Sequence, residues 1–431
     1  MKNKIIIGCM LFGALAANAQ QEPVTAENYK QKVLEYSRQI KQSSEERIAM
    51  QHAIKAAKTA FFPAVDFSGS YQYRINKYEL GMGDGIPGIP MDHNTYSLGA
   101  TVSQPIYSGG QIYNNYKAAQ IQGRITEQAE ELTTDNIIYA ADMNYWSVAA
   151  RKGMYDVMTQ YVDIVQELAN VLTIRFNDGQ ISKTDLLQVQ SRLKEAELNK
   201  STAYKDYQLS LQNLNVLMGI APLTPIEIAD SVTMVQAMPA KIGEEAALNN
   251  RPDYMISKLN IEYQLRQINL SKAKYNPTLA VGFQGTWGTA MLNVEGSEKL
   301  WTPAVFASLK IPLFRWGARF KEVNSQKALL RSKEYAMDNT RDQISQEVAN
   351  AWTNLTENTK QIMIAEDACK IAEENLDLNT FSYNEGKLPI LDVLSAQLSW
   401  IQSYSSLIQT WYQQKASLSQ YNKAVGIRRL Q

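Results

Sequence analysis

Apolar and polar residues follow two different periods in this chain. In four short stretches the apolar residues mostly fall at every second position, and in the first of them Val65, Phe67, Tyr71 and Tyr73 alternate with polar residues such as Asp66. A period of two is typical of a β-strand with one apolar and one polar face. The pattern predicts four strands, at residues 64–76, 95–106, 278–288 and 303–312.

Long stretches without helix breakers separate these strands. No proline occurs between Gly110 and Phe176, and neither proline nor a further glycine occurs between Gly317 and Tyr383. At about 1.5 Å per residue, each stretch would form a helical rod of roughly 100 Å. The predicted helices span residues 24–61, 110–176, 182–218, 244–275, 317–383 and 389–425.

Two of these helices carry a repeating step of three and four residues. The positions are Leu186, Val189, Leu193, Ala196, Lys200, Ala203, Tyr207, Ser210, Leu214 and Leu217 in one helix, and Leu391, Leu394, Leu398, Ile401, Ser405, Ile408 and Tyr412 in the other. Most of them are apolar. A sustained period of about 3.5 predicts that these helices pack side by side, as in coiled coils.

The chain contains the same arrangement twice. Gly179 recurs as Gly386, and Asp185 recurs as Asp392, in both cases 207 residues later. A constant offset over much of the chain indicates a tandem duplication. The predicted organisation is a first repeat at residues 20–219, an irregular connector at 220–243, a second repeat at 244–426 and a short tail at 427–431.

The N-terminus is typical of a secretory signal peptide. Lys2 and Lys4 are followed by an apolar run, and Ala17, Asn18 and Ala19 form a small-residue cleavage site. We therefore expect residues 1–19 to be removed on export. No other apolar run reaches the ~18 residues of a membrane-spanning helix, so a membrane span would have to be a β-barrel.

Composition argues against several classes of function. Lys and Arg total 43, and Asp and Glu also total 43, which gives no basic footprint for nucleic acid. His52 and His93 stand alone, and Cys369 would be the one cysteine of the mature chain, without a disulfide partner. Motifs for zinc hydrolysis, serine nucleophiles and phosphate binding are missing from the sequence. We therefore expect no catalysis, no cofactor and no metal site.

The strand count requires more than one copy of the chain. The smallest single-chain barrels have about eight strands, and an open sheet edge cannot face lipid because each unpaired backbone group there costs several kcal/mol. Several copies would therefore contribute strands to a shared barrel. The helices are too long to fold back onto so small a sheet, so they would project away from the membrane.

These features resemble the TolC family of outer-membrane efflux proteins over nearly all of the mature chain. The most specific match is the turn motif Leu376-Asp377-x5-Tyr383-x2-Gly386-x5-Asp392-Val393-Leu394-x2-Gln397, with a partial copy at residues 176–190. The resemblance implies a mostly α-helical homotrimer with a shared 12-stranded barrel in the outer membrane and a helical tunnel through the periplasm. It also implies a periplasmic adaptor protein and an inner-membrane transporter as partners, in tripartite efflux or type I secretion.

The two helix-turn tips are the first candidate site. Gly179 and Gly386 follow helix ends, where glycine with positive φ is favoured, and Ser182 with Asp185 resembles a capping box before the next helix. We also expect Pro389 at the first position of its helix. Local structure alone explains these residues. The functional interpretation is that the tips dock the adaptor through Gly179, Gln180, Ile181, Asp185, Gly386, Lys387, Leu388 and Asp392.

An acidic run before the second tip is the other candidate site. The resemblance implies that this hairpin bends inward and that Asp377, with Glu373 or Glu374, lines a constriction of the pore. The first repeat has Asn170 at the position of Asp377. A ring of acids would concentrate cations and repel anions. The alternative is an ordinary solvated helix face, and Arg175 is a possible basic partner of these acids.

Two functions from different classes follow from these patterns. One is an outer-membrane exit duct, with its helices in the periplasm. The other is a periplasmic coiled-coil scaffold that never enters lipid, although a scaffold has no need for four two-faced strands. The exported substrate, the adaptor and the pump are not encoded in any pattern of the chain.

Overall fold

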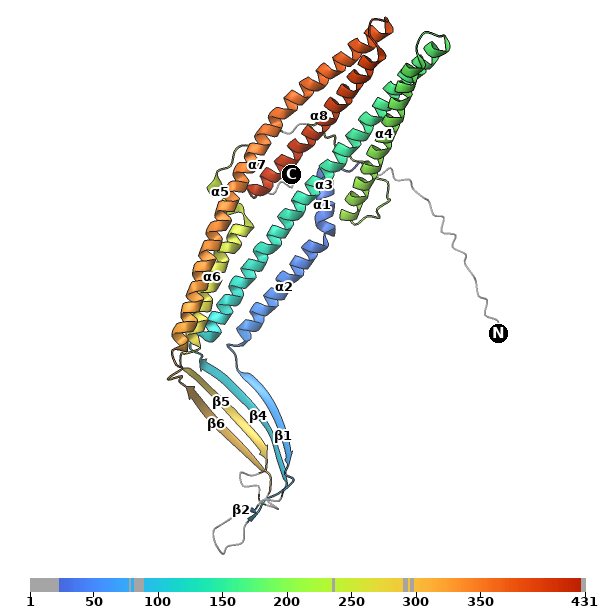
Figure 1. Ribbon diagram of the computed structural model, residues 1–431. Coiled ribbons are helices and arrows are strands. Elements are labelled where there is room, and N and C mark those ends of the chain that lie inside the picture. The colour runs from blue at the N-terminus through green and yellow to red at the C-terminus, as the bar shows by residue number, and fades with distance from the viewer. Residues whose placement is uncertain are drawn as a thin grey trace, which may run out of the picture.

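A computed structural model describes residues 23–76, 79–80, 89–234, 237–289, 294 and 298–427. The molecule is long and narrow, with helices over most of its length and a curved sheet toward one end (Figure 1). The predicted signal peptide at residues 1–19 lies outside the described residues, and so does the predicted tail at 427–431 except for its first residue.

Eight helices are found in the described residues. They are α1 (Ala26–Tyr36), α2 (Arg38–Thr59), α3 (Gln111–Asn177), α4 (Lys183–Leu217), α5 (Glu244–Asn250), α6 (Pro252–Ala273), α7 (Ala318–Asn384) and α8 (Ile390–Ala424). The two longest, α3 and α7, have 67 residues each, and α4 and α8 have 35 each, as a duplication requires. Among these helices, none is both long enough and apolar enough to cross a membrane.

Two of the predicted helices are wrong as continuous elements. The one at 24–61 is divided at Ser37, whose backbone leaves the helical region and whose hydroxyl accepts the Ile40 N–H at 3.3 Å. The one at 244–275 is divided at Arg251, which is extended at φ −85° and ψ 122°. Pro252 causes this second break, because proline disfavours helix at the residue before it and lacks an N–H of its own.

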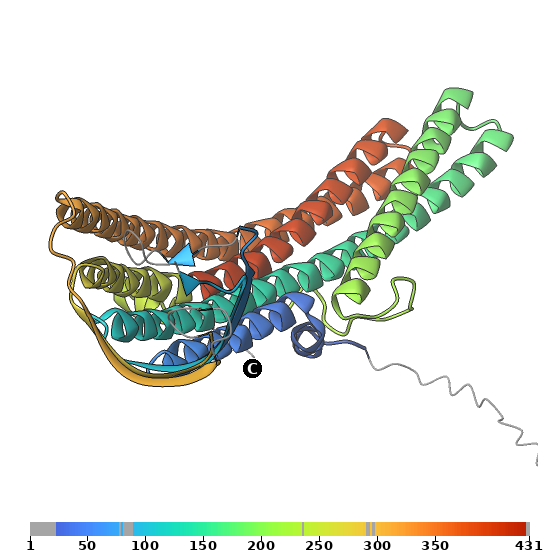
Figure 2. The same cartoon turned by 90° about the horizontal axis from the view of Figure 1, so that it is seen from below.

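The four predicted strands are present, with ends shifted by a few residues. They are β1 (Ala64–Tyr73), β4 (Asn94–Tyr107), β5 (Thr278–Gly288) and β6 (Leu300–Lys310). They form one antiparallel sheet in the order β1-β4-β5-β6. A small ribbon of β2 (Glu79–Leu80) and β3 (Ile89–Pro90) extends beyond it. The main sheet is strongly curved (Figure 2), and within the described residues its outer strands β1 and β6 each lack a neighbour on one side.

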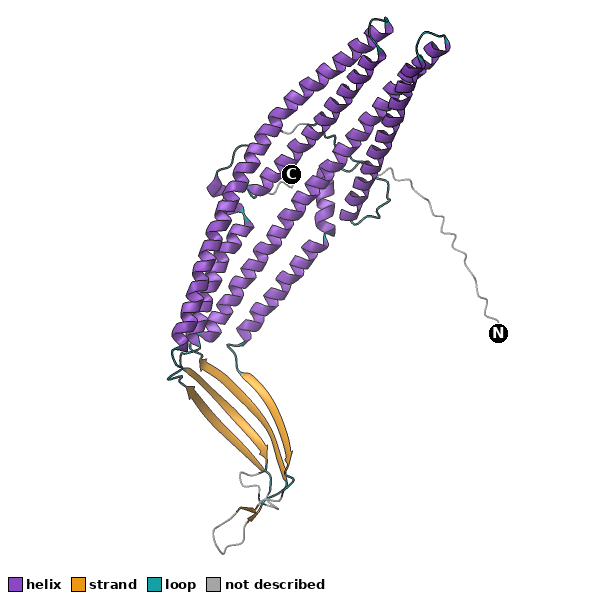
Figure 3. Cartoon of the chain, viewed as in Figure 1, coloured by secondary structure: helices purple, strands orange, loops and turns teal. Residues whose placement is uncertain are grey.

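The core of the chain lies among the helices, away from the sheet (Figure 3). The residues of the three-and-four repeat in α4, which form its predicted packing seam, are largely buried, with Val189 and Ala196 fully enclosed. In α8 the prediction is partly wrong, because Leu391 and Leu398 are exposed. That helix packs against both α3 and α7, so its buried surface is broader than one seam. Every residue of β1, in contrast, is exposed.

Candidate functional site: helix tips and acidic run

The two helix-turn tips lie at the same end of the molecule, remote from the sheet (Figure 1). One joins α3 to α4 and the other joins α7 to α8. Their backbones are alike. The Gly179 N–H donates to the Phe176 carbonyl at 2.9 Å and the Gln180 N–H to the Arg175 carbonyl at 2.8 Å.

The second tip repeats this pair of hydrogen bonds. The Gly386 N–H donates to the Tyr383 carbonyl at 2.9 Å and the Lys387 N–H to the Ser382 carbonyl at 2.9 Å. Gly179 and Gly386 both have φ of 73°, which confirms the expected positive φ. The combination satisfies the last helical carbonyls and is known as a Schellman motif.

The helices that leave the tips begin differently. At α4 the capping box is confirmed, because the Asp185 N–H donates to the Ser182 hydroxyl and the Asp185 carboxylate accepts from the Ser182 N–H. At α8 the expectation for Pro389 is off by one position. Pro389 is the extended residue just before the helix, with φ −74° and ψ 156°, and Ile390 is the first helical residue.

The predicted docking residues differ in how far they are presented to solvent. Six of them lie at the turns, and of these Gly179, Gln180, Gly386 and Lys387 are exposed whereas Ile181 and Leu388 are half-buried. Ile181 packs against the helical core. The exposed part of the tips is therefore mainly backbone and polar groups. The two helix-start acids differ as well, since Asp392 is exposed and Asp185 is half-buried.

A side-chain contact joins the two tips within one chain. The Arg175 guanidinium lies 5.3 Å from the centroid of the Tyr383 ring, and its Nη2 donates to Asn384 Oδ1 at 3.4 Å. Among the described residues Arg175 forms no ion pair with an acid. The basic residue suggested as a partner of the acidic run thus contacts an aromatic ring and an amide here.

The acidic run lies on the last turns of α7. Glu373, Glu374 and Asp377 are exposed on the single chain, and none forms an ion pair within the part of the chain that is described. Glu373 and Asp377 are four residues apart, so they share one side of the helix. Burial and the negative charge of Glu373 raise the pKa of the Cys369 thiol. A ring of acids at a pore constriction would need such exposed carboxylates without a basic partner. An ordinary solvated helix face would have them as well.

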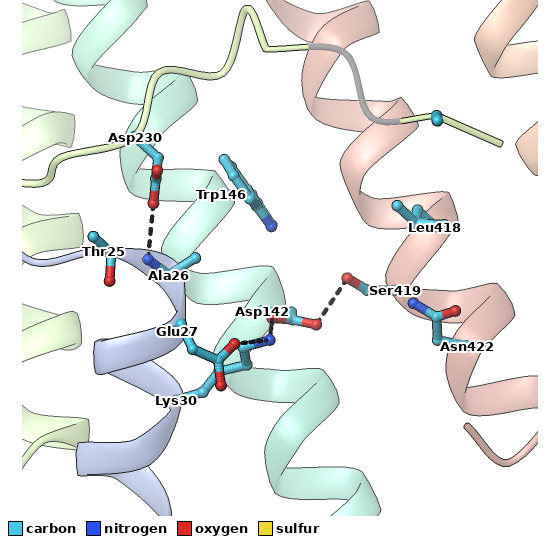
Figure 4. Close-up of a pocket in the computed structure, with 11 residues that line it drawn as sticks. Thr25, Ala26, Glu27, Lys30, Asp142, Trp146, Asp230, Leu418, Ser419 and Asn422 are labelled. Atoms are coloured by element: carbon cyan, nitrogen blue, oxygen red, sulfur yellow. Dashed lines mark hydrogen bonds and ion pairs between the residues drawn. The ribbon is translucent and has the colours of Figure 1, made fainter. Parts of the chain in front are cut away.

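A separate polar cavity lies between α1, α3, α8 and the connector (Figure 4). It measures about 460 Å³. Lys30 Nζ lies 3.1 Å from a Glu27 oxygen and 3.6 Å from an Asp142 oxygen, and the Ser419 hydroxyl donates to Asp142 at 3.0 Å. Burial raises the pKa of the Asp142 carboxyl, although the charge of Lys30 opposes it.

The connector is held at this cavity by Asp230. Its carboxylate accepts from the Ala26 N–H and from the Tyr145 hydroxyl, each at 2.8 Å. Near these groups Lys415 is only 2% exposed, and its Nζ lies 4.2 Å from the centroid of the Trp146 ring. The sequence contained a signal for Lys415, which continues the three-and-four step of α8 after Tyr412. The described residues contain no group of three or more His, Cys, Asp or Glu placed to hold a metal ion.

The described chain has open-edged strands at one end, duplicated helical hairpins over the rest and acidic residues near one tip. These features define a class of protein, the export channels of the outer membrane. The chain belongs to the outer membrane efflux protein family, whose model matches residues 30–220 and 245–426. The TolC-like resemblance of the sequence is thereby confirmed, and the protein is assigned to the outer membrane.

Individual relatives are distant but cover most of the chain. The outer membrane efflux protein BepC of Brucella suis biovar 1 (strain 1330) is 21% identical over 83% of this chain and 75% of its own length. The outer membrane protein TolC of Escherichia coli (strain K12) is 20% identical over 90% of this chain and 79% of its own. The crystal structure of the Campylobacter jejuni CmeC outer membrane channel has a TM-score of 0.79 at 16% identity, covering 93% of this chain and 85% of that one. This likeness confirms the fold.

Proposed function

We propose that this protein is a passive exit duct of the outer membrane, serving a tripartite efflux pump or a type I secretion system. The observation that carries the proposal is a four-stranded sheet which, in the part of the chain that the structure describes, has two open edges and an apolar face without a layer packed on it. Phe67 is 75% exposed and Val305 is 82% exposed on the single chain. Such surfaces are stable only against lipid or further protein.

The assembly that fits these edges is a ring of identical chains. A homotrimer would combine its strands into a 12-stranded barrel and its helices into a tunnel that opens at the tips. The number of copies comes from the TolC-like resemblance. The open edges themselves require only that more than one chain contributes.

Aromatic residues at both ends of the strands support insertion into a membrane. Tyr71, Tyr73, Tyr96, Trp287 and Trp301 lie toward the ends of the strands that are remote from the helices. Tyr78 lies outside the described residues. At the opposite ends, next to the helices, are Phe61, Phe62, Phe314, Trp316 and Phe320, all of them exposed. Two aromatic girdles are typical of outer-membrane proteins.

The tips are the part of the molecule that a periplasmic adaptor and an inner-membrane transporter would meet. Gly179, Gln180, Gly386 and Lys387 would offer backbone and polar contacts there, with Ile181, Leu388, Asp185 and Asp392 beside them. Asp377, with Glu373 and Glu374, would form the acidic constriction just inside this end. The duct itself would catalyse no reaction and bind no nucleic acid.

Cell fractionation tests this proposal. The protein is expected in the outer-membrane pellet, and it should stay there after washing with concentrated salt or with carbonate, because its contact with the membrane would be apolar. A peripheral scaffold held by charges would be released by the same wash, since salt screens ion pairs. Recovery in the soluble periplasm would contradict the proposal.

A further inference from the structure

The helix ends that adjoin the sheet carry basic side chains. The helices α2, α3, α6 and α7 meet the sheet, and their sheet-side ends lie next to one another (Figure 1). With the links to the strands, these ends comprise residues 53–63, 108–117, 267–277 and 311–324. Their basic residues form a basic collar, which consists of Lys55, Lys58, Lys117, Lys272, Lys274, Arg315, Arg319 and Lys321. On the single chain Lys117 is half-buried and the others are exposed.

Acidic residues do not balance the charge of this collar. The four stretches contain one acidic residue, Glu322, and it already has partners. Its carboxylate lies 3.3 Å from Lys274 Nζ and accepts from the Tyr275 hydroxyl at 2.9 Å. Within the part of the chain that is described, the other collar residues form no ion pair. The collar is therefore a surface of net positive charge.

Basic residues further from the sheet on the same helices have acidic partners. About 20 Å from the sheet-side ends of α2 and α3, Arg47 is paired with Glu130 at 2.6 Å and Arg124 with Glu262 at 3.2 Å. Over the whole chain basic and acidic residues balance, at 43 each. The positive charge of the collar is therefore a local feature of the helix ends next to the sheet.

The proposed membrane position of the sheet puts the collar among lipid headgroups. The strand β1 has 10 residues, and strands that rise about 3.3 Å per residue and tilt by about 40° cross roughly 25 Å, the height of the apolar band. The headgroup layer adds about 5–8 Å on each side. The collar residues lie within about two helical turns, roughly 11 Å, of the strands. Their long side chains can therefore reach the headgroups.

The backbone before α7 presents aromatic side chains beside the collar at a cost in strain. Trp316 has φ of 48°, and among the described residues it alone combines a side chain with positive φ. It is 90% exposed, and its ring lies 4.9 Å from that of Phe314. The first repeat has Gly109 at this position, with φ of 65°, and glycine adopts this conformation without strain. An exposed tryptophan in a strained position points to a partner outside the chain, and tryptophan favours membrane interfaces.

The second repeat also differs from the first in its basic residues at this point. Arg315 stands at the position of Ser108, and Arg319 at that of Ile112. The Ser108 hydroxyl accepts the Ile112 N–H at 3.3 Å, so the first repeat uses this position to begin its helix. The Arg315 guanidinium instead lies 5.6 Å from the centroid of the Tyr275 ring. A guanidinium placed on an aromatic face keeps the N–H groups of its edge available for phosphate oxygens.

We propose that the basic collar binds the phosphate groups of anionic phospholipids in the membrane leaflet next to the helices. Lysine and arginine donate charge-assisted hydrogen bonds to phosphate oxygens, and a row of them favours lipids of net negative charge. A zwitterionic lipid gains less, because its own ammonium group neutralises its phosphate. This inference rests on the proposed insertion of the sheet into the membrane and adds a chemical preference for the lipid found there.

Electron paramagnetic resonance of spin-labelled lipids tests the preference. The purified oligomer is reconstituted into phosphatidylcholine vesicles with a trace of spin-labelled phosphatidylglycerol or spin-labelled phosphatidylcholine, and the motionally restricted fraction gives the relative association constant. At low salt we expect phosphatidylglycerol to associate at least about twofold more strongly. Concentrated salt should bring the ratio toward one, because it screens the charges. The triple variant Arg315→Gln, Arg319→Gln and Lys321→Gln should lose about half of the preference, since other collar residues remain.

A second triple variant removes the same charge far from the sheet. It combines Lys194→Gln, Lys360→Gln and Lys370→Gln, three exposed positions, of which Lys360 lies about 60 Å along α7 from the collar. It should keep the full preference. Equal association of both lipids with the unmodified protein, or an equal loss in both variants, would overturn the inference. Flotation with the vesicles separates the two questions. An oligomer that floats without a lipid preference refutes this inference alone, whereas a folded oligomer that does not enter vesicles contradicts the duct as well.

Discussion

Among single residues, Lys415 has the environment least expected from its chemistry. It occupies a seam position of α8, and 2% of its surface is exposed. Burial lowers the pKa of Lys415 to about 8, while the negative charge of Asp230 acts in the opposite direction. A charged lysine in such a seam is costly unless an aromatic face and a nearby carboxylate compensate, and Trp146 and Asp230 supply these two groups.

This environment predicts a dependence of stability on pH. In the unfolded chain Lys415 returns to its ordinary pKa of 10.5, so between pH about 8 and 10 the unfolded state binds more protons than the folded one. The free energy of unfolding should therefore rise with pH across this window. Thermal unfolding of the purified protein should show a rise in Tm that Lys415→Met removes. The exposed control Lys55→Met should keep the rise, and an identical pH profile for both variants would contradict the prediction.

The acidic run leads to a second prediction at the residue scale. Asp377→Asn should reduce the preference of the open channel for cations, because a ring would lose one charge per copy close to the narrowest point. The measurement is the reversal potential under a salt gradient, which should move toward zero. Glu357→Gln is a matched control, since Glu357 lies on the same helix about 30 Å away and is paired with Lys360. Equal shifts for both variants would remove Asp377 from the constriction.

At the scale of elements, local pattern predicted most of the fold. Helices without proline and strands of period two were found because their signals are contained in neighbouring residues. The break at Arg251 was not predicted, although Pro252 is a local signal for it, since proline disfavours helix at the residue before it. The contact of Arg175 with Tyr383 was not predictable, since it joins residues about 200 positions apart. The exposure of Leu391 was not predictable either, because it depends on how α3 and α7 pack against α8.

The tips provide a prediction about how helices end. Gly386 has φ of 73°, and a Cβ there would meet nothing within 4 Å, so the cost of a side chain comes from the backbone alone. Gly386→Ala should destabilise the folded chain by about 1 kcal/mol, whereas Gly386→Asn should cost less because asparagine tolerates positive φ. Gly179→Ala should match Gly386→Ala, since the two turns share one geometry. Denaturant unfolding measures all three, and equal stability of the alanine and asparagine variants would contradict the account.

At the scale of the whole molecule, the single chain is incomplete. Among the described residues its sheet has two unpaired edges, and the apolar face of that sheet is exposed, as are Ile364, Ile371 and Leu378 on α7. Its helical half, in contrast, has a continuous core that reaches from α1 to the tips. The proposed ring of copies in a membrane would cover these open surfaces with neighbouring chains and lipid.

The central claim is that this ring encloses a water-filled path. Single-channel recording in a planar bilayer tests it most directly, with the oligomer extracted from outer membranes in mild detergent and its helical content verified beforehand. We expect discrete conductance steps that require the folded oligomer and disappear after heat denaturation. A correctly folded oligomer that inserts into the bilayer and never conducts would contradict it.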